Sequence, residues 1–249
     1  MSEQPSAADE IMDGVYHALR AHGYADVTMQ DIADECSKSK SLLHYHYDTK
    51  EDLLVAFLDH VITDSEARIE AHADDPPTER LVQFVGWFVF EPDAVDREAF
   101  HIALLELRTQ GPFNERIRDQ LVRSDRLLRG TVSDILESGI EAGIFRDVDV
   151  EETAALLVAT LDGARTRQIT LSGEANDDES NGKATDEKGE DGAERGRKPT
   201  AGGVSSTYTR TVAEATLQRV VGPLLAEGVE LPSLEDGIDE MTRDGRYEE

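Results

Sequence analysis

The spacing of apolar residues restricts the fold of this chain more than any other feature. Apolar side chains recur every three or four positions from residue 8 to residue 172. Ile11, Val15 and Leu19 illustrate the repeat, and Gly23 follows them as a helix stop. This period places apolar side chains on one face of an α-helix. The sequence therefore predicts an all-α protein.

Capping signatures place three helix starts, because a Thr or Asp followed three residues later by an acid can satisfy the first turn of a helix. They are Thr28 to Asp31, Thr49 to Asp52 and Asp149 to Glu152. Helical periodicity also covers about 81–90, 95–109, 113–142 and 205–227. Residues 84–90 would fit a β-strand as well, but we predict a helix because the segments around them are helical.

Two segments lack this pattern. Residues 173–203 contain no Val, Ile, Leu, Met or aromatic residue. Such a segment cannot offset its ordering entropy by burial, so we expect a disordered acidic loop. Residues 229–249 are acidic again, and we expect them to be a frayed tail.

Composition excludes several classes of protein. The chain has 53 acidic residues against 25 Lys and Arg, which gives a net charge of −28. The repulsion among these charges needs screening by salt. Together with the low number of lysines, six, this charge indicates a halophile. Taken alone, this charge argues against a polyanionic partner. No apolar run is long enough to span a bilayer, no signal peptide is visible, and the single Cys36 cannot form an internal disulfide. We expect a cytoplasmic protein with no membrane partner, no metal site and no cofactor.

One short window departs from the overall charge. Residues 36–47, CSKSKSLLHYHY, contain no acid, and they hold Lys38 and Lys40 beside two histidines and two tyrosines. Lys50 follows three residues later. A chance gap in acidity would also produce such a window, so its charge alone is weak evidence.

The expected geometry of this window is more informative. A helix over about 29–36, a polar break at 37–38 and a second helix over about 39–45 form a helix-turn-helix, whose second helix enters the major groove of DNA. The apolar residues of this unit would form a small core, with Ile32, Ala33, Leu43 and Tyr47 against Val15 and Leu19. Its lysines and serines would then face outward, where they can bond base edges or phosphates.

The run from Thr28 to Leu54, TMQDIADECSKSKSLLHYHYDTKEDLL, resembles the DNA-binding segment of the tetracycline-repressor-like transcriptional regulators. The positions that match the family pattern are Thr28, Ile32, Ala33, Ser39, Lys40, Leu43, Lys50, Glu51 and Leu53, with Tyr47 in place of Phe. The departures are Cys36, Ser37 in place of the turn glycine, Lys38, Ser41 and His44. Ser41 and His44 lie on the reading face, so the operator sequence cannot be taken from a relative.

The resemblance, with the window itself, indicates the DNA contacts. The residues expected there are Thr28, Met29, Lys38, Ser39, Lys40, Ser41, Leu42, His44, Tyr45, His46 and Lys50. It also implies a DNA-binding domain over 1–50 and a ligand-binding and dimerisation domain over 51–228. The helices at 150–172 and 205–227 would form a four-helix bundle with a partner subunit. The residues expected in its seam are Val158, Leu161, Ala164, Val212, Ala215 and Val220.

The body also holds most of the large aromatic residues, which are either ordinary core or the wall of an inducer pocket. The candidate ligand residues are Phe84, Trp87, Phe88, Phe100, His101, Arg108, Arg165 and Gln168. The function implied is that of a ligand-responsive homodimeric repressor, which binds a pseudo-palindromic double-stranded DNA operator and responds to a small-molecule effector.

Two other functions stay open. One is a ligand-independent architectural or division-control protein on the same fold. The other is an enzyme, although no Gly-rich phosphate loop, nucleophile elbow or zinc-protease motif is present in the sequence, so we expect no catalytic residues.

Overall fold

The structure is a computed structural model that describes residues 6–36, 38–89, 94–171 and 205–243. These residues form ten α-helices, and their one isolated β-bridge joins Phe145 to Leu225, so the all-α prediction is confirmed. The helices are α1 (Ala7–Asp26), α2 (Met29–Glu35), α3 (Lys40–His46), α4 (Lys50–Ala71), α5 (Pro77–Val89), α6 (Ala94–Arg108), α7 (Glu115–Glu141), α8 (Val150–Leu171), α9 (Ser205–Thr216) and α10 (Leu234–Arg243). No described helix is long and apolar enough to cross a membrane.

Local capping explains where the helices of the N-terminal part begin. The Thr28 hydroxyl accepts hydrogen bonds from the backbone of α2, and the Asp31 carboxylate accepts one in return from the Thr28 N–H at 2.8 Å. Thr49 and Asp52 form the same reciprocal pair at the start of α4, with 3.1 and 2.9 Å between the bonded atoms. At the third predicted start, the Asp149 carboxylate accepts the Glu152 N–H at 2.9 Å, and α8 begins at Val150. All three predicted helix starts are therefore confirmed.

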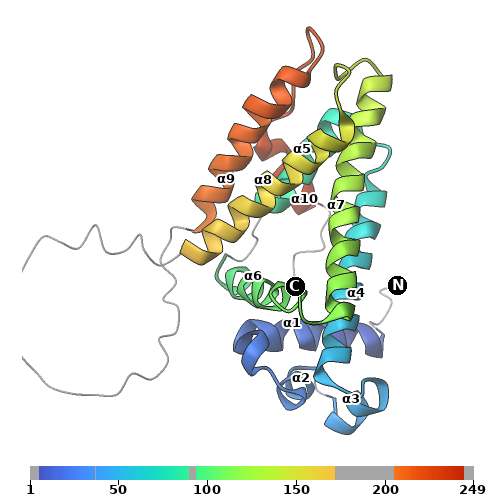
Figure 1. The fold of residues 1–249 in the computed structure, drawn as a ribbon, viewed down its shortest axis with the longest axis vertical. Helices are drawn as coiled ribbons and strands as arrows, with labels where there is room; N and C mark the ends of the chain where they lie inside the picture. The colour runs from blue at the N-terminus through green and yellow to red at the C-terminus, as the bar shows by residue number, and fades with distance from the viewer. Residues whose placement is uncertain (1–5, 37, 90–93, 172–204, 244–249) are drawn as a thin grey trace, which may run out of the picture.

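Helices α1 to α3 form a small head at one end of the molecule (Figure 1). Ile32 and Leu43 are fully buried against Val15 and Leu19, as the sequence predicts. Helices α1 and α2 touch closely at Gly14, because a Cβ there would lie 2.5 Å from the Cβ of Cys36. Cys36 is thus a core residue of the head.

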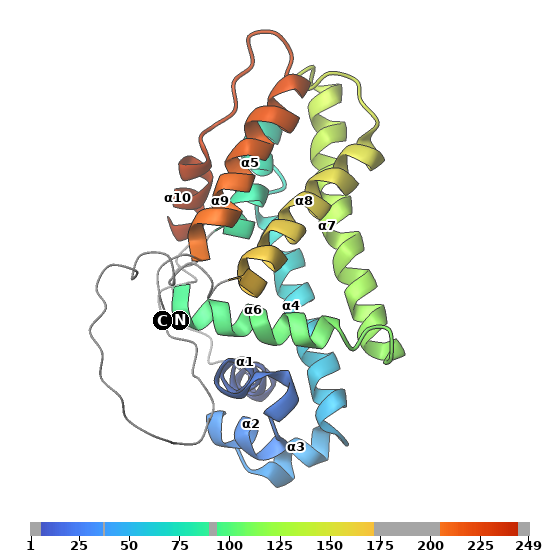
Figure 2. The same ribbon diagram turned by 60° about the vertical axis from the view of Figure 1, so that its left-hand side comes forward.

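The body is a bundle in which α4 rises from the head beside α7, while α8 and α9 lie side by side (Figures 1 and 2). Its core combines residues of α5, α7, α8 and α9, including Val85, Leu136, Leu161 and Ala213. Helix α5 contains residues 84–89 of the ambiguous segment, so the helical interpretation is confirmed for them. Helix α6 crosses the top of the head and packs along α1.

The structure corrects two expectations. Residues 234–243 are not frayed: they form α10, which packs on α5 with Leu234 buried and Gly237 against Val82. Its start, Ser233 to Asp236, is another capping box, with Asp236 N–H 3.2 Å from the Ser233 hydroxyl. The expected loop at 173–203 and the turn residue Ser37 lie outside the described residues.

The second correction concerns the expected dimer seam. Val158, Leu161 and Ala164 are buried in the core of their own subunit, because that face of α8 packs against α5 and α7. The other expected seam residues, Val212, Ala215 and Val220, are half-buried. The large apolar residues that α8 and α9 expose are Leu156, Leu171 and Tyr208.

Candidate nucleic-acid interface and effector cavity

Helix α3, the recognition helix expected from the sequence, is seven residues long and depends on two local features. The Ser39 hydroxyl caps it by accepting the Leu42 N–H at 3.2 Å, and Leu43 is its buried residue, with no exposed surface. A helix of this length is not stable alone. The Ser39 cap and the buried Leu43 side chain therefore hold α3 on the head.

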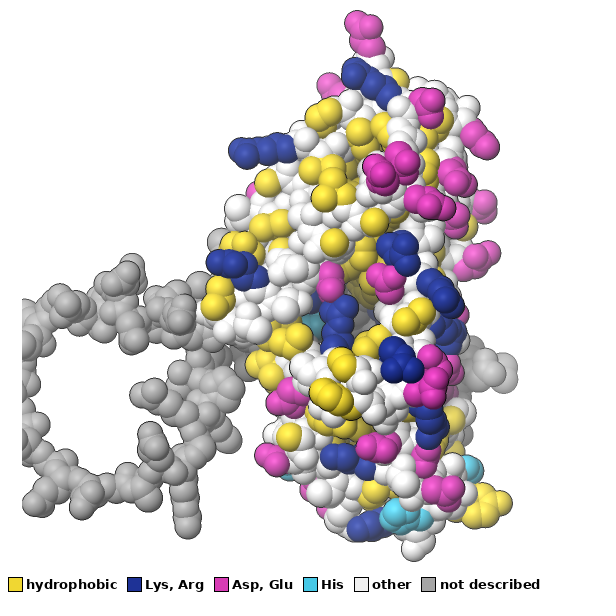
Figure 3. Space-filling model, viewed as in Figure 1, with side chains coloured by type: hydrophobic (Ala, Val, Ile, Leu, Met, Phe, Trp, Pro, Cys, Tyr) yellow, Lys and Arg dark blue, Asp and Glu magenta, His cyan; other side chains and the backbone are white. Residues whose placement is uncertain are grey.

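The outward face of α3 carries the polar side chains that the sequence indicates. Lys40, Ser41, His44, Tyr45 and His46 are exposed, and 82% of the Tyr45 surface is accessible. Leu42 is half-buried. These residues lie at the lower tip of the molecule, where histidine is visible in Figure 3. The arrangement presents donors, acceptors and aromatic edges on one protruding helix.

The three lysines near this face have different surroundings. Lys38 is ion-paired with Glu10 of α1, and its side chain is only 25% exposed. Lys50 donates from Nζ to the Tyr24 carbonyl oxygen at 3.1 Å and lies 5.2 Å from the centroid of the Tyr24 ring. For Lys40, the described residues provide no ion pair and no hydrogen bond to the side chain. Two of the expected phosphate contacts are therefore engaged within the protein.

The start of α2 requires a further correction. Thr28 is exposed, but its hydroxyl is used in capping. Met29, the first residue of α2, is 7% exposed and packs in the core of the head. Because its side chain is buried, Met29 is not available for the expected DNA contact.

A cavity of about 560 Å³ lies between the head and the body, with walls from α1, α4, α5, α6, α7 and α8. Six of the eight predicted ligand residues line it: Trp87, Phe88, Phe100, His101, Arg108 and Arg165. The aromatic residues Tyr16 and Phe57 complete the wall. Its size is that of cavities that hold small organic ligands.

Polar groups of this cavity are held in fixed positions. Arg108 bonds Asp162 at 2.7 Å, and this bond raises the pKa of Arg108. Arg165 donates to the carbonyl oxygens of Trp87 and Phe88 and lies 4.9 Å from the centre of the Phe88 ring. The buried Gln120 Oε1 accepts no hydrogen bond from the described residues, so it can receive one from a ligand.

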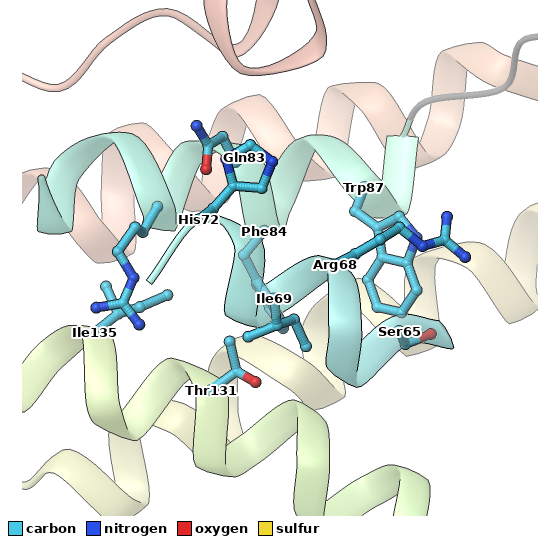
Figure 4. Close-up of a pocket in the computed structure, with 10 residues that line it drawn as sticks. Ser65, Arg68, Ile69, His72, Gln83, Phe84, Trp87, Thr131 and Ile135 are labelled. Carbon is cyan, nitrogen blue, oxygen red and sulfur yellow. The ribbon is translucent and has the colours of Figure 1, made fainter. Parts of the chain in front are cut away.

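A smaller cavity, of about 100 Å³, lies between α4, α5 and α7 (Figure 4). The residues that line it are Ser65, Arg68, Ile69, His72, Arg80, Gln83, Phe84, Trp87, Thr131 and Ile135. Ser65, Arg68 and Trp87 border both cavities. The predicted ligand residue Phe84 therefore belongs to the smaller cavity.

Gln168 does not line either cavity. It is buried, and its Oε1 accepts hydrogen bonds from the N–H of Thr209, at 2.8 Å, and from the Thr209 hydroxyl. It joins α8 to α9, so it is removed from the ligand set. Sequence reasoning missed Ser65, His72 and Thr131, because helical spacing shows that a residue faces inward but not whether it meets a cavity.

The chain matches known proteins over both parts. Residues 11–57 match the family model described as bacterial regulatory proteins, tetR family, and residues 77–184 match that of the BetI-type transcriptional repressor, C-terminal. A TetR transcription regulator from Haloarcula marismortui is 31% identical, with a TM-score of 0.68, over 88% of this chain and 98% of that chain.

More distant proteins are also similar to this chain over much of its length. A putative transcriptional regulator from Saccharomonospora viridis in complex with choline has a TM-score of 0.65 at 22% identity, over 89% of this chain and 98% of that one. The HTH-type transcriptional repressor AcnR of Corynebacterium glutamicum is 24% identical over 66% of this chain and 83% of its own length. The chain, with its helix-turn-helix head and helical body, belongs to the TetR family of transcriptional regulators.

Proposed function

We propose that this chain is a ligand-responsive homodimeric repressor, whose two α3 helices enter the two half-sites of a pseudo-palindromic operator. The observation that supports this most is the outward face of α3, where Lys40, Ser41, His44 and Tyr45 project from a helix that Leu43 anchors to the head. Lysine and serine can read base edges, and the Tyr45 hydroxyl can bind a phosphate.

The dimer is supported by the exposed apolar surface of α8 and α9. Leu156 is 54% exposed, Leu171 42% and Tyr208 43%. Apolar side chains gather over these two helices on the face shown in Figure 3. A second copy of the same face would bury them in an interface between identical surfaces. Leu156→Asp should therefore shift the protein from dimer to monomer in analytical ultracentrifugation.

The effector response is supported by the position of α6. One side of this helix lines the large cavity with Phe100, His101 and Leu104. The helix also holds the head, because Glu106 Oε2 accepts the Tyr24 N–H at 2.7 Å. Since Lys50 of α4 binds the carbonyl of the same Tyr24, a ligand that displaces α6 would alter the contacts that orient the head.

The experiment that tests the function is genome-wide mapping of DNA occupancy, followed by binding of the purified protein to the recovered sites. The proposal expects sites with two related half-sites, and loss of occupancy for a Lys40→Ala and His44→Ala double variant that remains folded. Recovery of DNA without any shared sequence would favour an architectural protein and would contradict operator recognition.

A further inference from the structure

Arg80, in the wall of the smaller cavity, has no acidic partner among the residues that the structure describes. It is half-buried at the start of α5, and the described residues give its side chain no ion pair and no hydrogen bond. The chain has 53 acidic residues, so acids are plentiful elsewhere. Partly burying a charge without a partner costs free energy, and an anion bound in the cavity would remove that cost.

Helix α5 places this charge at one end of an apolar strip. Arg80, Phe84 and Trp87 occupy positions i, i+4 and i+7, so all three lie on the cavity side of the helix. Seven residues of α-helix correspond to about 10 Å. Figure 4 shows Trp87 and Ser65 at one end of the cavity, His72 and Gln83 toward the other, and Ile69 beside Phe84 between them.

Of the two arginines in the described wall of this cavity, Arg80 is the one without a carboxylate partner. The hydroxyls of Ser65 and Thr131 donate to carbonyl oxygens of their own helices, each at 2.8 Å, so toward a ligand they can only accept. Arg68 is ion-paired with Asp64. The Asp75 carboxylate contacts His72 Nδ1 at 3.0 Å and Gln83 Nε2 at 3.2 Å, and it does not pair with Arg80.

We propose that the smaller cavity binds an amphipathic organic carboxylate, whose carboxylate meets the Arg80 guanidinium and whose apolar part lies against Phe84 and Trp87. The planar guanidinium can hold a carboxylate through two parallel hydrogen bonds. The smaller cavity, of about 100 Å³, is too small to enclose such a ligand, so the apolar part would extend past Trp87 into the larger cavity, which Ser65, Arg68 and Trp87 also border. This site gives the proposed effector a chemical class, and only its effect on DNA rests on the proposed function.

Trp87 makes the binding directly measurable, because it is the one tryptophan of the chain. The probes are 4-phenylbutanoate, 4-phenylbutanamide and 4-phenylbutylamine, which share an apolar part and differ in charge. They are titrated into the full-length protein at constant KCl while Trp87 emission is recorded. The anion should bind about tenfold or more tightly than the amide and the amine, as expected for a hydrogen bond between charged groups.

Arg80→Gln should lower the affinity for the anion to that for the amide, with circular dichroism confirming the fold. Arg80→Lys, which keeps the charge but loses the planar fork, should retain the preference for the anion at reduced affinity. The control Arg126→Gln removes the same charge from the exposed side of α7 and should leave binding unchanged.

Equal affinities for the three probes, or an Arg80→Gln protein that binds the anion as tightly as the wild type, would overturn the site. The proposed function is tested separately, by binding of the wild-type protein to its recovered DNA sites without any probe. Failure of the carboxylate site is therefore distinct from failure of the proposed DNA-binding function.

Discussion

Raising the KCl concentration should weaken operator binding by this protein far less than is usual for a repressor. Each phosphate that a lysine or arginine neutralises contributes about −0.9 to the slope of log affinity against log salt. We assign the phosphate contact of each head to Lys40, because Lys38 is ion-paired with Glu10 and Lys50 Nζ is held at the Tyr24 carbonyl oxygen. One such contact per head gives a slope of about −2 for a dimer, against roughly −5 to −9 for six to ten contacts.

The acidic surface should make the slope shallower still. With a net charge of −28 the protein is repelled by DNA, and molar salt screens this repulsion because the Debye length falls to about 3 Å. We therefore expect a slope between about −2 and zero, which becomes positive if repulsion dominates. The measurement is fluorescence anisotropy with labelled operator from moderate to molar KCl, with circular dichroism reporting the fold at each concentration.

A single substitution tests the assignment of Lys38. Glu10→Gln breaks its ion pair and frees the lysine for a phosphate, so the slope of the dimer should become steeper by about 2. The matched control is Glu35→Gln, which removes the same charge from an exposed position of α2 without releasing a lysine. A wild-type slope steeper than about −4 with the fold intact, or equal slopes for Glu10→Gln and wild type, would refute the reasoning.

Three further outcomes can be measured. Lys40→Ala and Ser41→Ala should change the preference among operator variants by about 1–3 kcal/mol, whereas Tyr45→Phe should weaken binding to all variants alike. Competition anisotropy measures these affinities, and uniform losses at all three positions would contradict these roles. Leu43→Ala removes the fully buried anchor of α3 and should cost about 2–5 kcal/mol in urea unfolding, more than Leu42→Ala at its half-buried neighbour. Hydrogen bonds from Arg116 and from Thr49 lower the pKa of Asp52 below its ordinary value of 3.8. The ionised Asp52 carboxylate therefore contributes its full stabilisation above about pH 3.8, and this stabilisation is lost as the pH falls through the lowered pKa. Asp52→Asn should therefore reduce the loss of thermal stability on acidification, and an unchanged acid profile would show that this carboxylate is not linked to folding.

The sequence alone was sufficient for the features that depend on short-range rules. Helical spacing predicts the faces of Val15, Leu19, Ile32 and Leu43 that form the core of the head, because a period of 3.6 residues decides which side chains share a face. The capping boxes are likewise local, since their two residues lie three positions apart. The same signature at Ser233 and Asp236 marks the start of α10, although the acidic composition of this segment indicates a frayed tail.

Only the tertiary structure decided which partners these side chains meet. Lys38 is 28 positions from Glu10 in the sequence, Lys50 is 26 from Tyr24, and Glu106 is 82 from the same tyrosine. No local pattern records such pairs, because they form only when separate helices pack together. The same holds for Arg80. Its place on α5 follows from helical spacing, but its position in a cavity wall, with no acidic partner among the described residues, depends on how α4, α5 and α7 pack around it.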